Sequence, residues 1–266
     1  MYIDTKKSKF EEKRYLRSLK GDDKFAALNE IIKISNRIVF FGGAGVSTES
    51  GIPDFRSKDG LYNQNDVQFD QYDPEYLLSH SCLYEKPNVF YEFYRQKLDV
   101  RAIEPNITHY KLAEMEKKGK LLGVITQNID GLHQKAGSRK VYEIHGTTSK
   151  NYCIDCKREF STDYIFNSET TIPRCDKCGG IVRPDVTLYG ESLPAKTWKN
   201  AKNIIYQADC LIVAGTSLTV YPAAGLVEEF EGRYVIIINM SDTKEDIRAD
   251  LIFREKMGEV FSKIKI

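Results

Sequence analysis

The chain reads Arg37-Ile38-Val39-Phe40-Phe41 and then Gly42-Gly43-Ala44-Gly45-Val46-Ser47-Thr48-Glu49-Ser50-Gly51-Ile52-Pro53-Asp54-Phe55-Arg56-Ser57. An apolar run that breaks into closely spaced glycines is typical of a buried strand ending in a phosphate-cradling turn, with backbone N–H groups and a helix N-terminus facing the charge. Thr48, however, stands where the ordinary dinucleotide fingerprint has its third glycine. The stretch therefore predicts a nucleotide site of unusual form.

Apolar strand-like runs alternate with helical patterns over most of the chain. Helical spacing is predicted for 24–36, 109–118, 198–207 and 222–230, which lead into strand-like runs at 38–41, 121–126, 211–214 and 234–239. Strands this apolar are buried on both faces, which favours an α/β fold with a Rossmann-like, doubly wound parallel sheet. Polar clusters follow three strands, at 126–131, 215–218 and 239–241, so we expect them to line one crevice at the carboxyl edge.

Two segments interrupt this alternation. Residues 58–105 are aromatic-rich and read as helical, and residues 147–186 contain four of the six cysteines. We expect both segments to build a smaller helical plus zinc-ribbon domain. The discontinuous Rossmann-like nucleotide-binding domain then comprises 22–57, 106–146 and 187–266. Residues 1–21 remain as an N-terminal extension, expected to be a solvated arm or helix.

The four cysteines form two pairs, Cys153-x2-Cys156 and Cys175-x2-Cys178, with eighteen residues between them. Four thiolates on two short turns suit tetrahedral zinc, and a site with no open position is structural. The alternative is two redox-active cysteine pairs, which is disfavoured because both pairs fit a single zinc ribbon. Zinc of this kind is also common in nucleic-acid-binding ribbons, so it does not by itself identify an enzyme.

The bulk composition excludes several classes of protein. The 266 residues carry a net charge of +1, with 41% hydrophobic and 29% charged residues, as in ordinary globular proteins. Near-neutral charge gives no general attraction to nucleic acid or anionic membranes. No apolar stretch is long enough to cross a bilayer, and the N-terminus lacks a signal-peptide pattern. We expect a cytoplasmic, monomeric protein.

His145 follows the strand-like run 140–144 and precedes a glycine, a position that suits a general base with a pKa near neutrality. His133 lies just after the polar cluster and could support it. The helical residues His80 and His109 look structural.

Other polar residues have simple structural alternatives. Asn128 and Asp130 are good helix caps, and Arg56 could form a surface ion pair with Asp54. Each alternative is reasonable separately, but together at matching strand ends they favour a site.

Taken together, these motifs closely resemble the sirtuins, which are NAD-dependent protein lysine deacylases. The resemblance runs from about residue 42 to the C-terminus. It rests on Gly43-Ala44-Gly45-Val46-Ser47, Gly51-Ile52-Pro53-Asp54-Phe55-Arg56, Thr126-Gln127-Asn128-Ile129-Asp130-Gly131-Leu132-His133, His145-Gly146, both cysteine pairs, Gly215-Thr216-Ser217-Leu218, Tyr221-Pro222-Ala223-Ala224 and Asn239.

The resemblance implies NAD as co-substrate and one structural zinc ion held by Cys153, Cys156, Cys175 and Cys178. It assigns the catalytic roles to His145, as base toward the ribose hydroxyls, and to Asn128. The implied NAD-binding residues are Gly43, Ala44, Gly45, Thr48, Asp54, Phe55, Arg56, Gln127, Asn128, Ile129, Asp130, His145, Gly215, Thr216, Ser217, Asn239 and Met257.

The implied partner is an acyl-lysine protein or peptide, held as a strand between 186–191 and 216–220. The products would be deacylated lysine, nicotinamide and O-acyl-ADP-ribose. Thr187-Leu188-Tyr189 stands where family members often have Val-Phe-Phe along the acyl-lysine tunnel. Arg95 lies one residue late for the Tyr-x-x-Arg of desuccinylating members, which rotates it by roughly 100° on a helix. We therefore expect acetyl and similar uncharged acyl groups.

Three competing functions remain open at this point. A mono-ADP-ribosyltransferase would use the same NAD site, although deacylation is the activity that needs His145. A dehydrogenase would leave the glycosidic bond of NAD intact. A zinc-ribbon nucleic-acid binder would need a basic, aromatic strip on 150–186, which the sequence lacks.

Overall fold

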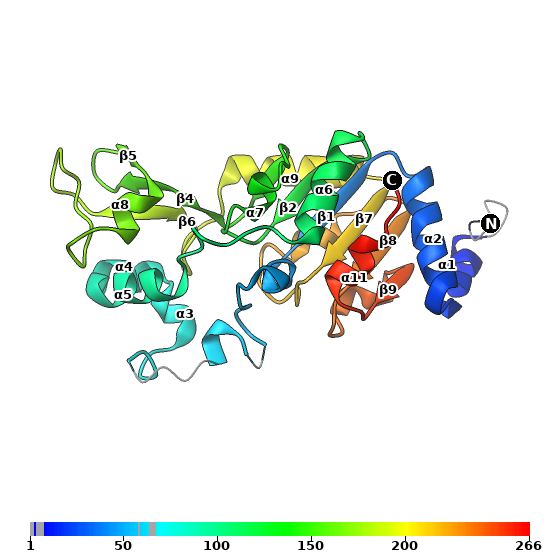
Figure 1. Cartoon of the computed structure of the whole chain (residues 1–266), viewed down its shortest axis with the longest axis horizontal. Helices are drawn as coiled ribbons and strands as arrows, with labels where there is room; N and C mark the ends of the chain where they lie inside the picture. Colours follow the sequence, from blue (N-terminus) through cyan, green and yellow to red (C-terminus); the bar gives the residue numbers. More distant parts are fainter. Residues whose placement is uncertain (1–2, 4–7, 58, 64–67) are drawn as a thin grey trace.

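The computed structural model describes residue 3 and residues 8–57, 59–63 and 68–266. A six-stranded sheet with the order β3-β2-β1-β7-β8-β9 forms the larger domain (Figure 1). Each neighbouring pair is parallel, and the order reverses between β1 and β7, which makes the sheet doubly wound as predicted. The strands are β1 (Ile38–Gly42), β2 (Leu121–Thr126), β3 (Val141–Glu143), β7 (Cys210–Ala214), β8 (Tyr234–Ile238) and β9 (Leu251–Phe253).

Alternate residues of the central strands pack into two separate cores. On β1, Phe40 joins one core and Phe41 the other, and all five residues of this strand are buried. Side chains on a strand point alternately to its two faces, so a strand covered on both sides is apolar throughout. This is why the continuous apolar runs predict a doubly covered parallel sheet.

Helices cover both faces of this sheet (Figure 1). The first core receives side chains from α2 (Gly21–Ile34), α6 (Ile107–Lys117) and α11 (Met257–Ser262). The second receives them from α9 (Ala195–Gln207) and α10 (Gly225–Glu228). The prediction of a helix over 222–230 is wrong in extent, because turn hydrogen bonds from Ala224 to Val220 and from Gly225 to Pro222 precede a single helical turn.

The smaller domain combines three antiparallel strands with helices, and we call it the small lobe. Its sheet has the order β5-β4-β6, and it shares one hydrophobic core with the helices of the first insertion. The elements are α3 (Pro74–Leu77), α4 (His80–Glu85), α5 (Pro87–Lys97), β4 (Gly146–Cys153), β5 (Glu159–Phe160), α8 (Thr162–Phe166) and β6 (Val182–Val186). The two insertions therefore lie together, as predicted (Figure 1).

The N-terminal extension forms helix α1 (Lys9–Ser18), which begins with a capping box between Ser8 and Glu11. The N-terminal segment was expected to be a solvated arm or helix, but the helix is partly buried. Leu16 is buried in the sheet's core, and the buried Glu12 accepts hydrogen bonds from Arg233 and Tyr234. None of the helices in the described ranges is long and apolar enough to span a membrane.

Candidate active site

The glycine-rich loop leaves β1 and is pinned against the end of β7. The amide of Gly43 donates to the Ala214 carbonyl at 3.2 Å, and that of Gly45 donates to the Gly215 carbonyl at 2.9 Å. A Cβ on Gly45 would lie 2.7 Å from the Gly215 Cα, so the close approach of the two loops requires glycine. Two 3₁₀ turns, η1 (Ala44–Val46) and η2 (Thr48–Ser50), follow in place of the expected helix N-terminus.

The polar strand ends meet beside this loop. Gln127, after β2, donates through Nε2 to the Thr216 hydroxyl at 2.8 Å. Asn128 donates through Nδ2 to Ser47 Oγ at 3.0 Å, and Ser47 donates to Asp130 Oδ2 at 2.6 Å. Ser47 therefore links the glycine loop to the polar cluster after β2, a role that sequence reasoning missed although its motif contains the residue.

Asp130 is not the N-cap of the short helix α7 (Leu132–Lys135), because Gly131 occupies that position. Its Oδ1 accepts from the Leu132 amide at 2.9 Å and so holds the turn that leads into the helix. Its other oxygen receives the Ser47 hydroxyl and faces the glycine loop.

His145 lies between β3 and β4, where the chain passes from the large sheet to the small lobe. Its Nδ1 is 3.0 Å from the Gln127 carbonyl oxygen. Because a carbonyl only accepts, Nδ1 carries the hydrogen in this bond and Nε2 keeps its lone pair. Burial lowers the pKa of His145 below its usual value, which the Gln127 hydrogen bond partly opposes. The side chain is therefore a neutral, oriented base.

His133 does not support the polar cluster. It is buried against Phe40 and His109, and among the described residues neither of its ring nitrogens has a hydrogen-bond partner. His109 accepts from the Asn106 amide through Nδ1 at 3.2 Å and helps to cap α6. Both histidines pack inside the large domain.

One cavity of about 830 Å³ gathers all the residues assigned to NAD. Its wall includes Gly43, Ala44, Gly45, Thr48, Asp54, Phe55, Arg56, Gln127, Asn128, Ile129, Asp130, His145, Gly215, Thr216, Ser217, Asn239 and Met257. Residues 186–191, which follow β6 of the small lobe, line the same cavity. The cavity thus lies between the carboxyl edge of the large sheet and the small lobe.

The suggested ion pair between Arg56 and Asp54 is wrong. Arg56 Nη2 donates to Glu75 Oε1 at 2.8 Å and to the Tyr189 hydroxyl at 3.0 Å. Asp54 instead accepts from the Ser57 amide at 2.8 Å, which holds the loop's own turn. Sequence proximity gave no signal for the distant partners Glu75 and Tyr189.

The sulfur atoms of Cys153, Cys156, Cys175 and Cys178 all lie within 4.8 Å of one another. Zn–S bonds of about 2.3 Å in a tetrahedron place sulfur atoms about 3.8 Å apart, and two of the observed separations are 3.4 and 3.7 Å. None of these cysteines forms a disulfide. The donor set therefore fits one zinc ion with no open position.

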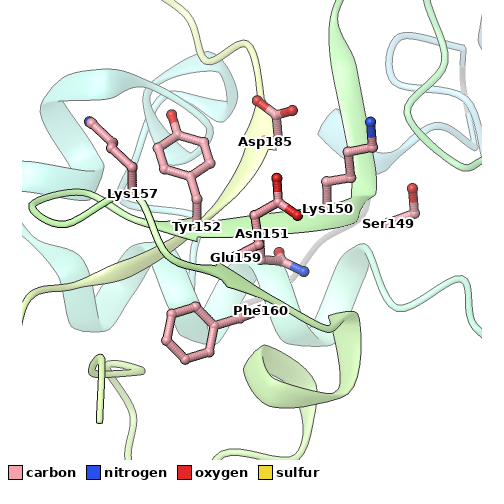
Figure 2. Close-up of a pocket in the computed structure, with 8 residues that line it drawn as sticks. All are labelled: Ser149, Lys150, Asn151, Tyr152, Lys157, Glu159, Phe160 and Asp185. Carbon is pink, nitrogen blue, oxygen red and sulfur yellow. The ribbon is translucent and has the colours of Figure 1, made fainter. Parts of the chain in front are cut away.

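A second cavity, of about 490 Å³, lies on the sheet of the small lobe (Figure 2). Its wall combines Lys150 and Lys157 with Glu159 and Asp185, beside Tyr152. Phosphate backbones are bound by predominantly cationic surfaces. The mixed charge of this cavity does not favour nucleic acid as its ligand.

The Sir2 family model matches residues 43–222, which span the glycine loop, the polar strand ends at 126–131 and 215–218, His145 and all four zinc-site cysteines. The chain belongs to the Sir2 family. A relative named NAD-dependent protein deacetylase from Clostridium acetobutylicum is 52% identical over 243 residues, which cover 91% of this chain and 98% of the relative. A protein of the same name from Clostridium perfringens is 50% identical over 245 residues, with 91% and 99% covered.

Solved Sir2 structures have the same fold. A Sir2 enzyme structure described for its mechanism and regulation is 41% identical, covers 91% of this chain and 96% of its own, and has a TM-score of 0.81. A Sir2 complex with acetylated peptide is 33% identical and has a TM-score of 0.79, and the match covers 90% of this chain and 96% of the Sir2 chain. The Sir2 fold thus accounts for the parallel sheet with its smaller cysteine-bearing domain.

Proposed function

We propose that this Sir2 chain is an NAD-dependent protein lysine deacetylase whose products are deacylated lysine, nicotinamide and O-acyl-ADP-ribose. The observation that carries the proposal is the cavity in which the glycine loop, the polar strand ends and an oriented His145 meet. The relatives named NAD-dependent protein deacetylase and the Sir2 complex with acetylated peptide support it.

The residues of the cavity fit NAD. A Cβ on Gly45 would clash with Gly215, so glycine lets the loop pack against the end of β7 and form the cavity wall where the NAD phosphates would bind. When bound, NAD would release nicotinamide and supply the ADP-ribosyl group that accepts the acyl group. Gln127 and Asn128 orient the nicotinamide ribose, and Ile129 and Asp130 form the carboxamide pocket. Thr216, Ser217 and Asn239 hold the adenosine half, with Met257 at its end.

His145 accepts a proton from a ribose hydroxyl through Nε2. The Gln127 carbonyl fixes the Nδ1–H tautomer, so this nitrogen is available as an acceptor. The lowered pKa of His145 keeps the base neutral at physiological pH. Positioning and proton transfer are thus the chain's main contributions, because departure of a cationic leaving group needs no strong acid.

The zinc ion holds the small lobe together and takes no part in the chemistry, because four thiolates leave it no position for substrate. Residues 186–191, on the connection from this lobe to the NAD-binding domain, receive the acyl-lysine peptide opposite 216–220. We place the domain boundaries at 22–57, 106–146 and 187–266 for the NAD-binding domain and at 58–105 and 147–186 for the small lobe. The protein acts as a monomer in the cytoplasm, without direct nucleic-acid or membrane contact.

The acyl preference is for acetyl and other uncharged groups. Arg95, the candidate for binding an acidic acyl group, donates to the carbonyls of Ile165 and Thr170 inside the small lobe. Tyr91 donates to the Val182 carbonyl at 2.7 Å. Neither side chain lines the cavity around His145. An acyl chain ending in a carboxylate therefore gains no cationic partner from helix α5, which carries Tyr91 and Arg95.

A panel of acyl-lysine peptides, assayed with NAD by nicotinamide release and by peptide mass, tests the proposal. We expect acetyl-lysine to be cleaved with a higher kcat/KM than succinyl-lysine, with one nicotinamide released per lysine freed. Transfer of labelled ADP-ribose to a protein, with no loss of acetyl groups, would favour the mono-ADP-ribosyltransferase instead. Turnover without free nicotinamide would indicate a dehydrogenase.

A further inference from the structure

A single nitrogen of Arg56 joins the cofactor-side loop to the small lobe and to the connection that leaves it after β6. Arg56 Nη2 donates to Glu75 Oε1, in the first turn of α3, at 2.8 Å. It also donates to the hydroxyl of Tyr189, which follows β6, at 3.0 Å. Arg56 and Tyr189 both line the cavity that holds His145. The free protein therefore already has this guanidinium at the cavity wall.

Tyr189 is well placed to hold another side chain, because its own backbone is fixed. Its amide donates to the Leu78 carbonyl at 3.0 Å, and its carbonyl accepts from the His80 amide at 2.9 Å. Its hydroxyl lies 3.2 Å from the hydroxyl of Tyr62. A guanidinium only donates, so the Tyr189 oxygen accepts from Arg56 and keeps its own hydrogen for Tyr62.

We propose that Tyr189 is a positioning residue for Arg56 and holds the guanidinium toward the phosphates of NAD. Glu75 has the opposite effect on NAD affinity, because its carboxylate offsets the positive charge of Arg56. The proposal rests on the proposed function. The neutral Tyr189 hydroxyl orients the cation without reducing its attraction for an anion. The Glu75 carboxylate competes with the phosphates for the same cation. Tyr189 stands where family members often have phenylalanine, so this hydroxyl distinguishes the chain.

The two partners of Arg56 therefore have opposite effects on NAD affinity. Tyr189→Phe keeps the ring but removes the hydroxyl, and we expect the NAD Kd and KM to rise about two- to fivefold, because the Arg56–Tyr189 bond is partly exposed. Glu75→Gln keeps an acceptor but removes the charge, and we expect both constants to fall about twofold at low salt. In Glu75→Gln, kcat and the KM for acetyl-lysine peptide stay within about twofold of the parent. Tyr189 lies in the segment proposed to bind the peptide, so the Tyr189→Phe variant is judged by its NAD constants alone.

The measurement is NAD binding to each purified variant by calorimetry, followed by steady-state kinetics at two salt concentrations. Tyr84→Phe is the matched control, since it removes an exposed tyrosine hydroxyl of the small lobe that lies outside the cavity, and its NAD Kd should stay close to that of the parent. An unchanged Kd in Tyr189→Phe, or a rise in both Tyr189→Phe and Glu75→Gln, overturns the proposal. Because calorimetry needs no turnover, opposite Kd shifts support the positioning role even in a protein that fails to deacetylate.

Discussion

The large sheet and the small lobe bury their interiors by different means. Every residue of β1, β7 and β8 is buried, and helices cover both faces of the sheet they form. In the small lobe, β4 mixes buried, partly buried and exposed residues, and β5 has only two residues. Four cysteines and an aromatic core supply what these short strands lack. The small sheet of this lobe buries little apolar surface, so a bound metal adds stability that the large sheet obtains from its buried apolar area.

The active site draws on both regions, so their difference has a functional consequence. The large sheet supplies the glycine loop and polar strand ends for NAD. The segment proposed to bind the peptide, 186–191, leaves the small lobe at the end of β6 and is hydrogen-bonded to that lobe at Leu78 and His80. His145 lies on the connection between them. Perturbing each region separately should therefore remove different steps of the reaction.

Loss of the zinc ion should have the largest effect. Structural zinc supplies about 10 kcal/mol or more to small metal-stabilised domains, so Cys175→Ser should unfold the small lobe and abolish acetyl-lysine peptide binding. The large sheet should persist, giving a partial loss of ellipticity rather than complete unfolding. Metal analysis, circular dichroism and peptide titration check this outcome.

Cys82→Ala is the matched control for the zinc prediction. Cys82 is buried in the same core but is not part of the four-cysteine cluster, so its replacement should retain one zinc per chain. Wild-type protein purified without metal, or a Cys175→Ser variant that binds peptide normally, would contradict the assignment.

His145→Ala should slow the deacetylation reaction without destabilising the large domain or the small lobe. Removing a general base costs about 10²- to 10⁴-fold in rate, and we expect NAD binding to change far less. Because the pKa of His145 is lowered by burial, the acid limb of the kcat/KM profile should lie below pH 6.5 in the parent. Stopped assays of acetyl-lysine peptide across pH 5 to 9 measure both effects.

His80→Ala serves as the control for this variant. His80 is exposed and lies outside the cavity, stacked on Tyr84. Its replacement should leave the pH profile unchanged. Substantial deacetylation by His145→Ala would refute the role given to the base.

The sequence predicted the elements that depend on local pattern. The apolar runs at 121–126 and 234–239 coincide with β2 and β8 to within one residue, because a strand buried on both faces has an unmistakable composition. Helix α1 was predicted to be solvated, since its sequence is mostly polar and only its packing reveals that Leu16 and Glu12 are covered. Composition indicates what a segment can bury, but tertiary contacts decide which face is buried.

The site divides in the same way. Motif spacing predicts one cluster of four cysteines, and the four sulfur atoms do lie together. Ser47 is separated along the chain from Asn128 by 81 positions and from Asp130 by 83, and Arg56 is separated from Tyr189 by 133. No local pattern encodes such pairs, because they form only after distant parts of the chain have packed together.

The smallest effect concerns stability within the large domain, where His109 and His133 are buried in contact with each other. Burial lowers the pKa of His109 to about 4 and that of His133 to about 3. Between pH 6.5 and about 4 the unfolded chain therefore binds more protons than the folded one, so the free energy of unfolding should fall as the pH is lowered. Each histidine contributes about 1.4 kcal/mol per pH unit in that window.

His133→Gln isolates this contribution, because glutamine does not titrate and other acid-sensitive groups, the zinc thiolates included, are common to both proteins. Urea unfolding at pH 5 and pH 6.5 should show a loss of stability that is smaller in the variant by about 2 kcal/mol, the share of one histidine over 1.5 units. Equal losses in parent and variant would mean that His133 is protonated in the folded state.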